Sequence, residues 1–235
     1  MKNLTSYDRT WTHVYGDMQD HGPVHRHMRR ILKAVLSKLS YRTVMDVGCG
    51  LGHNIPFYAD SKHPLQKIDG IDISKTAISY CRSHFPGNFR QMDIQAHAPA
   101  GIWDLVFCSL LLEHVEQDVR VIRNLRKMTG KHLVITTISG DFDRYNRYEQ
   151  QMGHVRNYKR GALEQLLEKN GFIVDTAIYW GFPFYSPIGR MLINSQKAKH
   201  TFTKEQHILS WMSYLLYFLN CWHVGDLLVI VAHSQ

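Results

Sequence analysis

The sequence predicts an α/β domain that is doubly wound around a mostly parallel sheet. Two features of the chain indicate this class. Short runs of β-branched and apolar residues alternate with segments whose apolar residues recur at helical spacing. The first of these runs, residues 43–47, leads directly into a cluster of glycines. With 235 residues the chain can bury one large core, and we expect a single domain over 1–235.

Each expected strand is a short apolar run bounded by glycine, proline or polar residues. The run at 103–111 is apolar enough to be buried on both faces of the sheet. The expected strands are 43–47, 67–73, 89–94, 103–111, 132–137, 172–179 and 226–232.

The expected helices carry apolar residues every three to four positions. Pro23 starts the first well-defined helix, because proline fits the first helical turn, and Ser74 caps a later one with its side-chain oxygen. Gly130 is expected to end the helix that follows the fourth strand. The expected helices are 6–21, 24–39, 52–59, 74–84, 115–128 and a segment around 163–167.

Two segments interrupt the alternation of strands and helices. Residues 139–157 form a polar loop rich in Tyr and Arg, and residues 182–223 form an insertion with an aromatic helix at about 204–221. Long excursions in a compact domain often serve as lids or binding elements. The chain is therefore divided into an N-terminal helical cap, a core and an inserted helical cap. These parts are 1–39, 40–181 with 224–235, and 182–223.

The chain is basic, with a formal net charge of +8 and a pI of about 9.3. An anionic partner such as a nucleic acid, an anionic lipid or an acidic substrate would suit this charge. The basic residues are scattered, however, apart from a modest cluster at 25–30, and no basic stripe is interleaved with aromatic residues. A nucleic acid is therefore not the expected partner, and the oligomeric state is left open.

Three further features of the sequence bear on membrane association, cellular location and metal binding. The apolar stretch 208–222 is shorter than the roughly 18–20 residues of a membrane span, so no transmembrane segment is expected. Peripheral contact with a membrane surface stays open. No apolar run follows Met1, and the four cysteines form no CxxC pair, which indicates the reducing cytoplasm. The 15 histidines lack spacing such as HExxH, so no metal site is predicted.

The most informative segment is 45–52, where an expected strand runs into Gly48, Gly50 and Gly52. Glycine lets the backbone approach a ligand closely at a turn from strand to helix. The dinucleotide pattern GxGxxG would need glycine at the position of His53, and a P-loop would need a Gly-Lys-Ser/Thr run. The loop therefore suits a nucleoside ligand that is smaller than a dinucleotide.

Acidic residues accompany three successive expected strands. Asp46 lies two residues before the first glycine, Asp72 ends the second strand, and Asp93 ends the third. A carboxylate at the position of Asp72 can accept hydrogen bonds from both ribose hydroxyls, and one at Asp93 could bind the exocyclic amine of adenine. Either residue could instead cap the segment that follows it. Three such carboxylates beside one glycine loop favour ligand binding.

Seven segments of the chain follow the motif pattern of one enzyme family. They are Val-Met-Asp-Val-Gly-Cys-Gly-Leu-Gly at 44–52, Gly-Ile-Asp-Ile-Ser at 70–74, Gln-Met-Asp-Ile at 91–94, Trp-Asp-Leu-Val-Phe-Cys-Ser at 103–109, Leu-Glu-His-Val at 112–115, Gly-His-Val-Arg-Asn-Tyr at 153–158 and Leu-Leu-Glu-Lys-Asn-Gly-Phe at 166–172. As a set they resemble the class I S-adenosylmethionine-dependent methyltransferases, in particular the ubiquinone-biosynthesis-like (type 11) small-molecule group. The resemblance covers about 40–181 and the last strand, whereas 1–39 and 182–223 match no signature.

The resemblance implies a seven-stranded sheet in the order 3-2-1-4-5-7-6 with the last strand antiparallel. It also implies S-adenosylmethionine as the cofactor. In that site the backbone of Gly48 and Gly50 would lie along the methionine part of the cofactor. Asp72 would bind the ribose, and Asp93 with Ile94 would flank the adenine. The other cofactor residues that it implies are Asp46, Cys49, Ile73 and Ser109.

Methyl transfer from a sulfonium needs alignment of acceptor, methyl carbon and sulfur, and an oxygen or protonated nitrogen acceptor must also lose a proton. His114, just beyond the fourth strand, is the first candidate base, and His154 in the polar loop is the second. Either histidine could instead be structural, and Glu113 is a weaker candidate. The residues expected to contact the acceptor are Tyr15, Tyr145, Tyr148 and Tyr158.

The expected activity is therefore methyl transfer to an oxygen or nitrogen atom of a small biosynthetic acceptor. The sequence lacks the Asp/Asn-Pro-Pro-aromatic motif of amino methylation and the Pro-Cys context of cytosine C5 methylation. Methylation of a lipid-like quinone or of RNA, and a cofactor-binding scaffold without turnover, are the alternatives. The aromatic stretch 211–219 could pack on the core, line the acceptor site or lie on a membrane surface, and its lack of Lys and Arg disfavours the last.

Overall fold

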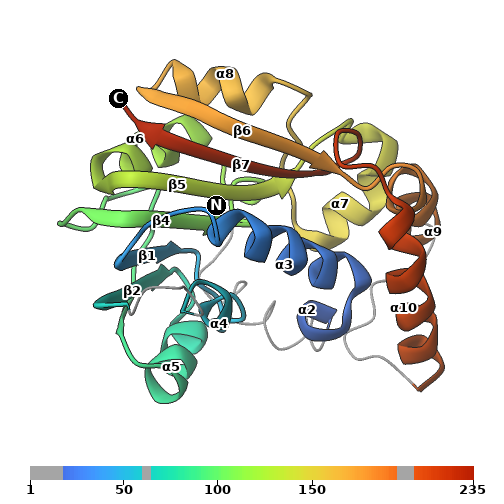
Figure 1. Cartoon of the computed structure of the whole chain (residues 1–235), viewed down its shortest axis with the longest axis horizontal. Coiled ribbons are helices and arrows are strands. Elements are labelled where there is room, and N and C mark those ends of the chain that lie inside the picture. The colour runs from blue at the N-terminus through green and yellow to red at the C-terminus, as the bar shows by residue number, and fades with distance from the viewer. Residues whose placement is uncertain (1–17, 60–64, 195–203) are drawn as a thin grey trace.

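The computed structural model describes residues 18–59, 65–194 and 204–235 (Figure 1). Its strands form a seven-stranded sheet in the predicted order, β3-β2-β1-β4-β5-β7-β6. β1 to β5 run parallel, and β7 pairs antiparallel with both β5 and β6, which confirms the predicted direction of the last strand. The strands are β1 (Thr43–Val47), β2 (Lys67–Asp72), β3 (Asn88–Gln91), β4 (Trp103–Ser109), β5 (Thr129–Ile138), β6 (Phe172–Trp180) and β7 (Leu227–Ser234).

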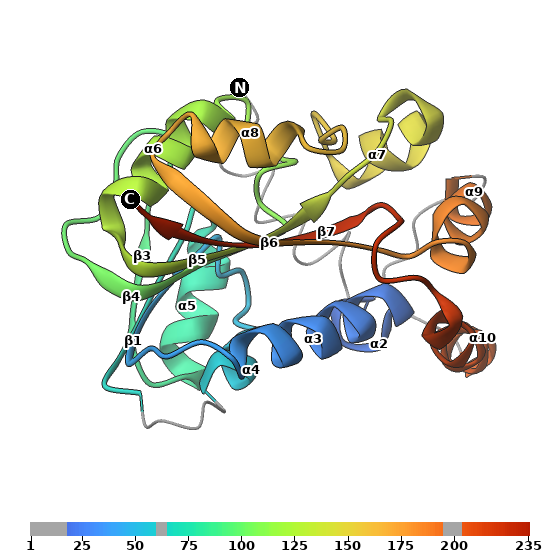
Figure 2. The same ribbon diagram turned by 45° about the horizontal axis from the view of Figure 1, so that its top comes forward.

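Helices cover both faces of this sheet. The helices of the core are α3 (Pro23–Leu36), α4 (Ile55–Ala59), α5 (Lys75–His84), α6 (Asp118–Met128) and α8 (Ala162–Glu168). Figure 2 shows α6 and α8 on one side of the sheet and α3, α4 and α5 on the other, the arrangement of a doubly wound fold.

The side chains of β4 explain why both faces need helices. Val106 and Cys108 are fully buried in the cluster that contains the apolar residues of α6 and α8. Leu105 and Phe107 alternate with them and are buried in the cluster that contains the apolar face of α3. A strand buried on both sides reads as a continuous apolar run, so the prediction for this strand is confirmed.

The remaining helical segments lie outside this layered core. Figure 1 shows α7, α9 and α10 together at one end of the sheet, on the right of the view. These segments are α2 (Met18–His21), a 3-10 turn η2 (Asp143–Tyr145), α7 (Asn146–Met152), a kinked turn η3 (Phe184–Gly189), α9 (Arg190–Asn194), α10 (Lys204–Leu216) and a 3-10 turn η4 (Tyr217–Leu219). Among the described residues, no helix is long and apolar enough to cross a membrane; the cytoplasmic location stays a prediction.

The third strand is shorter than predicted, and its end is placed wrongly by the sequence. β3 stops at Gln91, so Asp93 lies in the following turn rather than at a strand end. The Asp93 carboxylate accepts a hydrogen bond from Gln95 N at 2.8 Å, and its carbonyl accepts one from Ala96 N at 3.0 Å. These local bonds compete with strand pairing, which is why an aspartate so often begins a turn.

The prediction that Gly130 ends α6 is wrong. The helix ends at Met128, Thr129 is already extended, and Gly130 lies within β5. The Thr129 hydroxyl donates to Leu125 O at 2.8 Å, which occupies a carbonyl at the helix end. This position needs a glycine, because a Cβ there would lie 3.0 Å from Trp103 O on the neighbouring strand.

The segment 139–157, predicted as a loop, contains η2 and α7. This prediction fails because α7 lacks an apolar stripe, and the side chains that it buries are Glu149 and Met152. Other helix and strand ends are shifted by a few residues: α3 stops at Leu36, α4 begins at Ile55 and β4 stops at Ser109. Of the helix expected over 6–21, all but the last four residues lie outside the described part of the chain.

Candidate functional site

The glycine loop after β1 is bound to the end of β2. Gly48 N and Cys49 N both donate to Ile71 O, at 2.8 and 3.0 Å. Gly50 N donates to Asp72 Oδ2 at 2.9 Å. Gly48 and Gly50 have φ values of +73° and +51°, a region in which a side chain would be strained. The loop therefore depends on glycine for its shape.

Asp72 joins this loop to the following helix. Its carboxylate is buried and also accepts a hydrogen bond from Ser74 N at 2.8 Å. Ser74 in turn caps α5, because its hydroxyl accepts a hydrogen bond from Ala77 N at 3.1 Å. A charged carboxylate at the carboxyl end of β2, beside the glycine loop, is where the resemblance puts the ribose contact.

Asp46 lies behind the glycine loop and is buried. Its Oδ2 accepts a hydrogen bond from the Tyr58 hydroxyl at 2.9 Å. Burial raises the pKa of Asp46 to about 7; the Tyr58 hydrogen bond opposes this shift, and the nearby Asp72 carboxylate adds to it. Cys49 is buried beside this pair. Asp46 thus joins the end of β1 to Tyr58 of α4, next to the buried Cys49 of the loop.

The predicted adenine side is a short backbone segment held from two directions. Asn124 Nδ2, on α6, donates to Ile94 O at 2.7 Å. Gln91 Nε2 donates to Ile73 O at 3.0 Å. Ile94 is buried and Asp93 is half-buried. Because β1, β2 and β3 are parallel neighbours, Ile73, Asp93 and Ile94 lie at the same end of the sheet as the glycine loop.

The end of β4 contains a strained residue that the sequence does not reveal. Leu110 has a φ of +51°, which is unusual for a residue with a side chain and costs about 1–3 kcal/mol. Leu110 N donates to Thr136 O at 2.8 Å, and the predicted cofactor residue Ser109 shares a 2.7 Å hydrogen bond with the Thr136 hydroxyl. Glu113 and His114 follow this strained residue by three and four positions.

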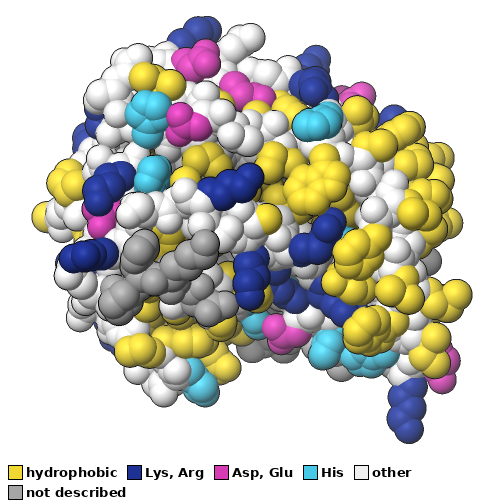
Figure 3. Space-filling model, viewed as in Figure 1, with side chains coloured by type: hydrophobic (Ala, Val, Ile, Leu, Met, Phe, Trp, Pro, Cys, Tyr) yellow, Lys and Arg dark blue, Asp and Glu magenta, His cyan; other side chains and the backbone are white. Residues whose placement is uncertain are grey.

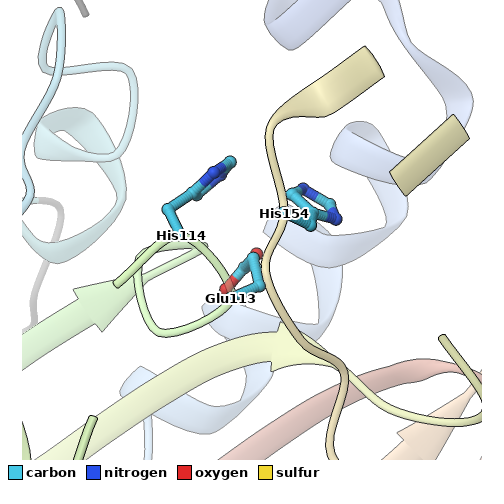
Figure 4. Close-up of side chains that lie close together, drawn as sticks. All are labelled: Glu113, His114 and His154. Atoms are coloured by element: carbon cyan, nitrogen blue, oxygen red, sulfur yellow. The ribbon is translucent and has the colours of Figure 1, made fainter. Parts of the chain in front are cut away.

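Glu113, His114 and His154 come together beyond the ends of β4 and β5 (Figure 4). The two imidazole rings meet edge to face with their centroids 4.6 Å apart. Each of the three residues offers a possible metal-ligand atom, and these atoms lie within 4.8 Å of one another. The residues come from two loops about 40 positions apart in the chain, so spacing in the sequence could not show this cluster.

His154 is held by a buried carboxylate. Its Nδ1 pairs with Glu149 Oε2, and Glu149 is fully buried on α7. Asn157 Nδ2 donates to Glu149 Oε1 at 2.9 Å. Arg190, which begins α9 in the insertion, pairs with Glu149 and donates to Asp226 Oδ2 at 2.7 Å. This network connects the insertion, α7 and the entry to β7. Glu149 and Arg190 carry no signal in the sequence, since neither belongs to a motif.

Glu113 is fully buried below the two histidines. The Thr137 hydroxyl donates to Glu113 Oε2 at 2.8 Å, whereas Glu113 Oε1 is buried without a hydrogen-bond partner. Burial raises the pKa of Glu113, and the nearby His154 opposes that shift. His114 Nδ1 lies 3.4 Å from Gly153 O, which accepts its hydrogen bond.

The predicted acceptor-side tyrosines fall in different places. Tyr145 is buried under Arg190, whose guanidinium carbon lies 4.1 Å from the ring centroid. Tyr148 lies nearby on α7, and burial raises its pKa. Tyr158 is buried in the core on the α6 side of the sheet, and its hydroxyl donates to Asp118 at 2.9 Å, so it is engaged in a structural contact. Tyr15 lies outside the described residues.

Comparison with known proteins agrees with this architecture. The family model for the methyltransferase domain matches residues 21–177. The ubiquinone biosynthesis O-methyltransferase of Vibrio cholerae is 28% identical over 158 residues, which cover 62% of this chain and 62% of that protein. The chain thus spans less than two thirds of the length of that relative.

Solved structures show the same fold at low identity. An S-adenosylmethionine-dependent methyltransferase from Mesorhizobium loti has a TM-score of 0.59 and 18% identity, over 87% of this chain and 96% of that one. A magnesium protoporphyrin IX methyltransferase from Synechocystis, with bound S-adenosylmethionine, has a TM-score of 0.54 and 14% identity, over 90% and 82% of the two chains.

The chain belongs to the methyltransferase domain family. Its sheet has the strand order that the resemblance predicted, and solved structures of methyltransferases share this fold. The predictions of the fold and of membership in a methyltransferase family are therefore confirmed, whereas the cofactor and the roles of single site residues stay predictions.

Proposed function

We propose that this protein transfers the methyl group of S-adenosylmethionine to an oxygen or nitrogen atom of a small-molecule acceptor. When bound, the cofactor supplies an electrophilic methyl carbon on a sulfonium with a neutral leaving group. The described residues fit this ligand: the glycine loop brings bare backbone to the end of β1, and Asp72 offers a carboxylate beside it. Asp93 and Ile94 flank the adenine in this proposal.

The observation that carries the acceptor side is the cluster of His114 and His154 at the carboxyl ends of β4 and β5. His114 is half-buried, whereas only 8% of the His154 side chain is exposed, so His114 is the better placed of the two to meet an acceptor. His114 takes the proton that the acceptor hydroxyl or ammonium loses.

The surrounding contacts set the state of both imidazoles. An Nδ1–H that donates to Gly153 O fixes the His114 tautomer in which Nε2 carries no proton, which is the form that a base needs. Glu149 orients His154, and the His154 ring packs against the edge of His114. His154 and Glu149 are therefore positioning residues, and Arg190 keeps Glu149 in place.

An acceptor screen tests the proposal. Release of S-adenosylhomocysteine is measured with phenols, catechols, carboxylates and amines, each with and without a chelator because Glu113 and the two histidines could also hold a cation. For an acceptor that is turned over, His114→Ala should lower kcat by about 10²–10⁴-fold and remove the acidic limb of the pH–rate profile. The surface variant His84→Ala is the matched control and should behave as wild type.

Two outcomes would contradict this assignment. If His114→Ala keeps its kcat while His154→Ala loses it, His154 is the base. If no small molecule is turned over but RNA is methylated, with binding that weakens steeply with salt, the acceptor class is wrong. Tight cofactor binding without turnover of any acceptor would favour a scaffold.

A further inference from the structure

The strongest feature outside the proposed site is an apolar surface on the insertion. Of the nineteen strongly exposed large apolar side chains in the described part of the chain, fourteen lie between residues 182 and 224. Figure 3 shows hydrophobic side chains gathered over α9 and α10. We call this surface the apolar face; its six most exposed members are Leu192, Ile208, Leu209, Met212, Leu215 and Leu219, each at least 60% exposed.

The helix α10 is oriented with its polar side toward the protein. Ser210 is its buried residue, and the Ser210 hydroxyl donates to His21 O at 2.5 Å. Gln206, Ser213 and Tyr214 share the inner side with Ser210 at helical spacing, and all three are partly buried. An amphipathic helix on a protein that meets only water buries the opposite side.

This orientation is fixed by specific contacts with α3. His27 is fully buried against Trp180, Tyr214 and Phe218, and its Nε2 forms a 2.8 Å hydrogen bond with Tyr214 O. Because the inner side of α10 is held in this way, the apolar side must face outward. Contiguous apolar patches on a protein surface mark interaction sites.

Arginines of α3 border the apolar face. The Arg26 guanidinium lies 3.9 Å from the ring centroid of Trp211, and that of Arg30 lies 4.7 Å from the ring of Phe218. Neither arginine forms an ion pair with a carboxylate of the described residues, and Arg30 Nε is buried without a hydrogen-bond partner. Figure 3 shows Lys and Arg side chains along this border.

We propose that the apolar face docks on a lipid bilayer that contains anionic phospholipids. A bilayer offers phosphates at its surface and acyl chains below, and this matches arginines that border an apolar helix with Trp at the junction. α10 lies in the plane of the interface, with Leu and Met side chains entering the acyl region. The arginines that the sequence of 211–219 lacks are supplied by α3, which packs against α10.

Vesicle co-sedimentation of the full chain tests this inference. Binding should be strong to phosphatidylcholine vesicles with about 30% phosphatidylglycerol, weak to phosphatidylcholine alone, and reduced by salt. Met212→Glu with Leu215→Glu should lower the partition coefficient roughly tenfold or more. Ile102→Glu is the matched control, because Ile102 is 66% exposed but lies outside the apolar face, and it should bind as wild type.

The charge contribution is tested separately. Arg26→Gln with Arg30→Gln should lower binding to the anionic vesicles roughly 25-fold, since each basic side chain near such a surface adds about 1 kcal/mol, or roughly fivefold. Arg120→Gln, at an exposed position of α6, should have no effect. Circular dichroism of each variant verifies folding.

Two results would overturn the inference. One is equal recovery of wild type and Met212→Glu/Leu215→Glu protein with the vesicles. The other is sedimentation velocity that shows a dimer which the same double variant dissociates, since a second copy would then cover the apolar face. Vesicle binding requires no methyl transfer, so this test succeeds or fails independently of the proposed acceptor chemistry.

Discussion

The cofactor end and the acceptor end of the proposed site are built in different ways. The cofactor end is assembled from neighbouring turns, with Gly50 and Ser74 both donating to Asp72. The acceptor end depends on Glu149, which bonds to His154 nearby but also to Arg190, 41 positions away in the insertion. A local motif therefore encodes the cofactor end, whereas the acceptor end exists only once the insertion has packed against α7.

This difference has a consequence for stability. The cofactor loop is stabilised by backbone hydrogen bonds, by glycine conformation and by the Asp72 carboxylate, which accepts two bonds from backbone N–H groups. The acceptor end concentrates buried charge in one network, and removal of one member leaves an uncompensated charge. Variants of the two ends should therefore separate cofactor binding, folding and acceptor chemistry.

The largest effect on folding is expected for Arg190→Met. Without the guanidinium, Glu149 loses its buried cationic partner, and the free energy of unfolding should fall by about 3–5 kcal/mol in urea titrations. Addition of Glu149→Gln should restore part of the loss, because the buried charge is then gone. Arg147→Met, at an exposed site on the same helix as Glu149, should change stability by less than about 0.5 kcal/mol. A loss below about 1 kcal/mol in Arg190→Met would show that the network does not hold the insertion.

A pH-dependent effect is expected at Asp46. The unfolded chain releases the Asp46 proton near pH 3.8, whereas the folded chain keeps it until pH about 7. The stability contributed by protonated Asp46 is thus complete below pH 3.8 and is lost as pH rises toward 7, by up to about 1.4 kcal/mol per pH unit.

The variant that tests this linkage is Asp46→Asn. Asparagine has no proton to lose and can still accept the Tyr58 hydrogen bond, so the stability of the variant should fall less between pH 4 and 7 than that of wild type. Asp141→Asn, at an exposed site, should leave the pH dependence unchanged. Parallel curves for wild type and Asp46→Asn would contradict the shifted pKa.

The smallest effect is expected for Tyr158→Phe. It removes one hydrogen bond to Asp118, which keeps its ion pair with Arg156, so the free energy of unfolding should fall by about 1 kcal/mol. Because the hydroxyl faces α6, the KM of an acceptor should stay the same. A folded variant whose acceptor KM rises strongly would instead support the substrate contact predicted from the sequence.

The sequence predicted the layered core and the cofactor loop because both depend on local patterns. Continuous apolar runs identify strands such as β4. Gly48 and Gly50 lie in the short motif 44–52, and Asp72 lies in the short motif 70–74. His114 and His154 were predicted as candidate bases because they follow the fourth expected strand and lie in the loop after the fifth. Their mutual contact was not, since it depends on how α7 packs.

Other features could not be predicted because their signal is tertiary. The apolar periodicity that predicts a helix is absent from α7, whose buried Glu149 is compensated by Arg190. The aromatic helix was predicted, but the direction of its apolar side was not, because only the docking of Ser210 and Tyr214 against the protein decides it. Leu110 carries no sequence signal for its positive φ.

Calorimetric titration of S-adenosylmethionine tests the separation of the two ends most directly, because it needs no acceptor. Wild type and His114→Ala should bind the cofactor with affinities that agree within about twofold, whereas Asp72→Ala should bind at least roughly tenfold more weakly, since it loses charged hydrogen bonds. Absence of binding to wild type, an unchanged affinity in a folded Asp72→Ala protein, or loss of binding in His114→Ala would contradict this account.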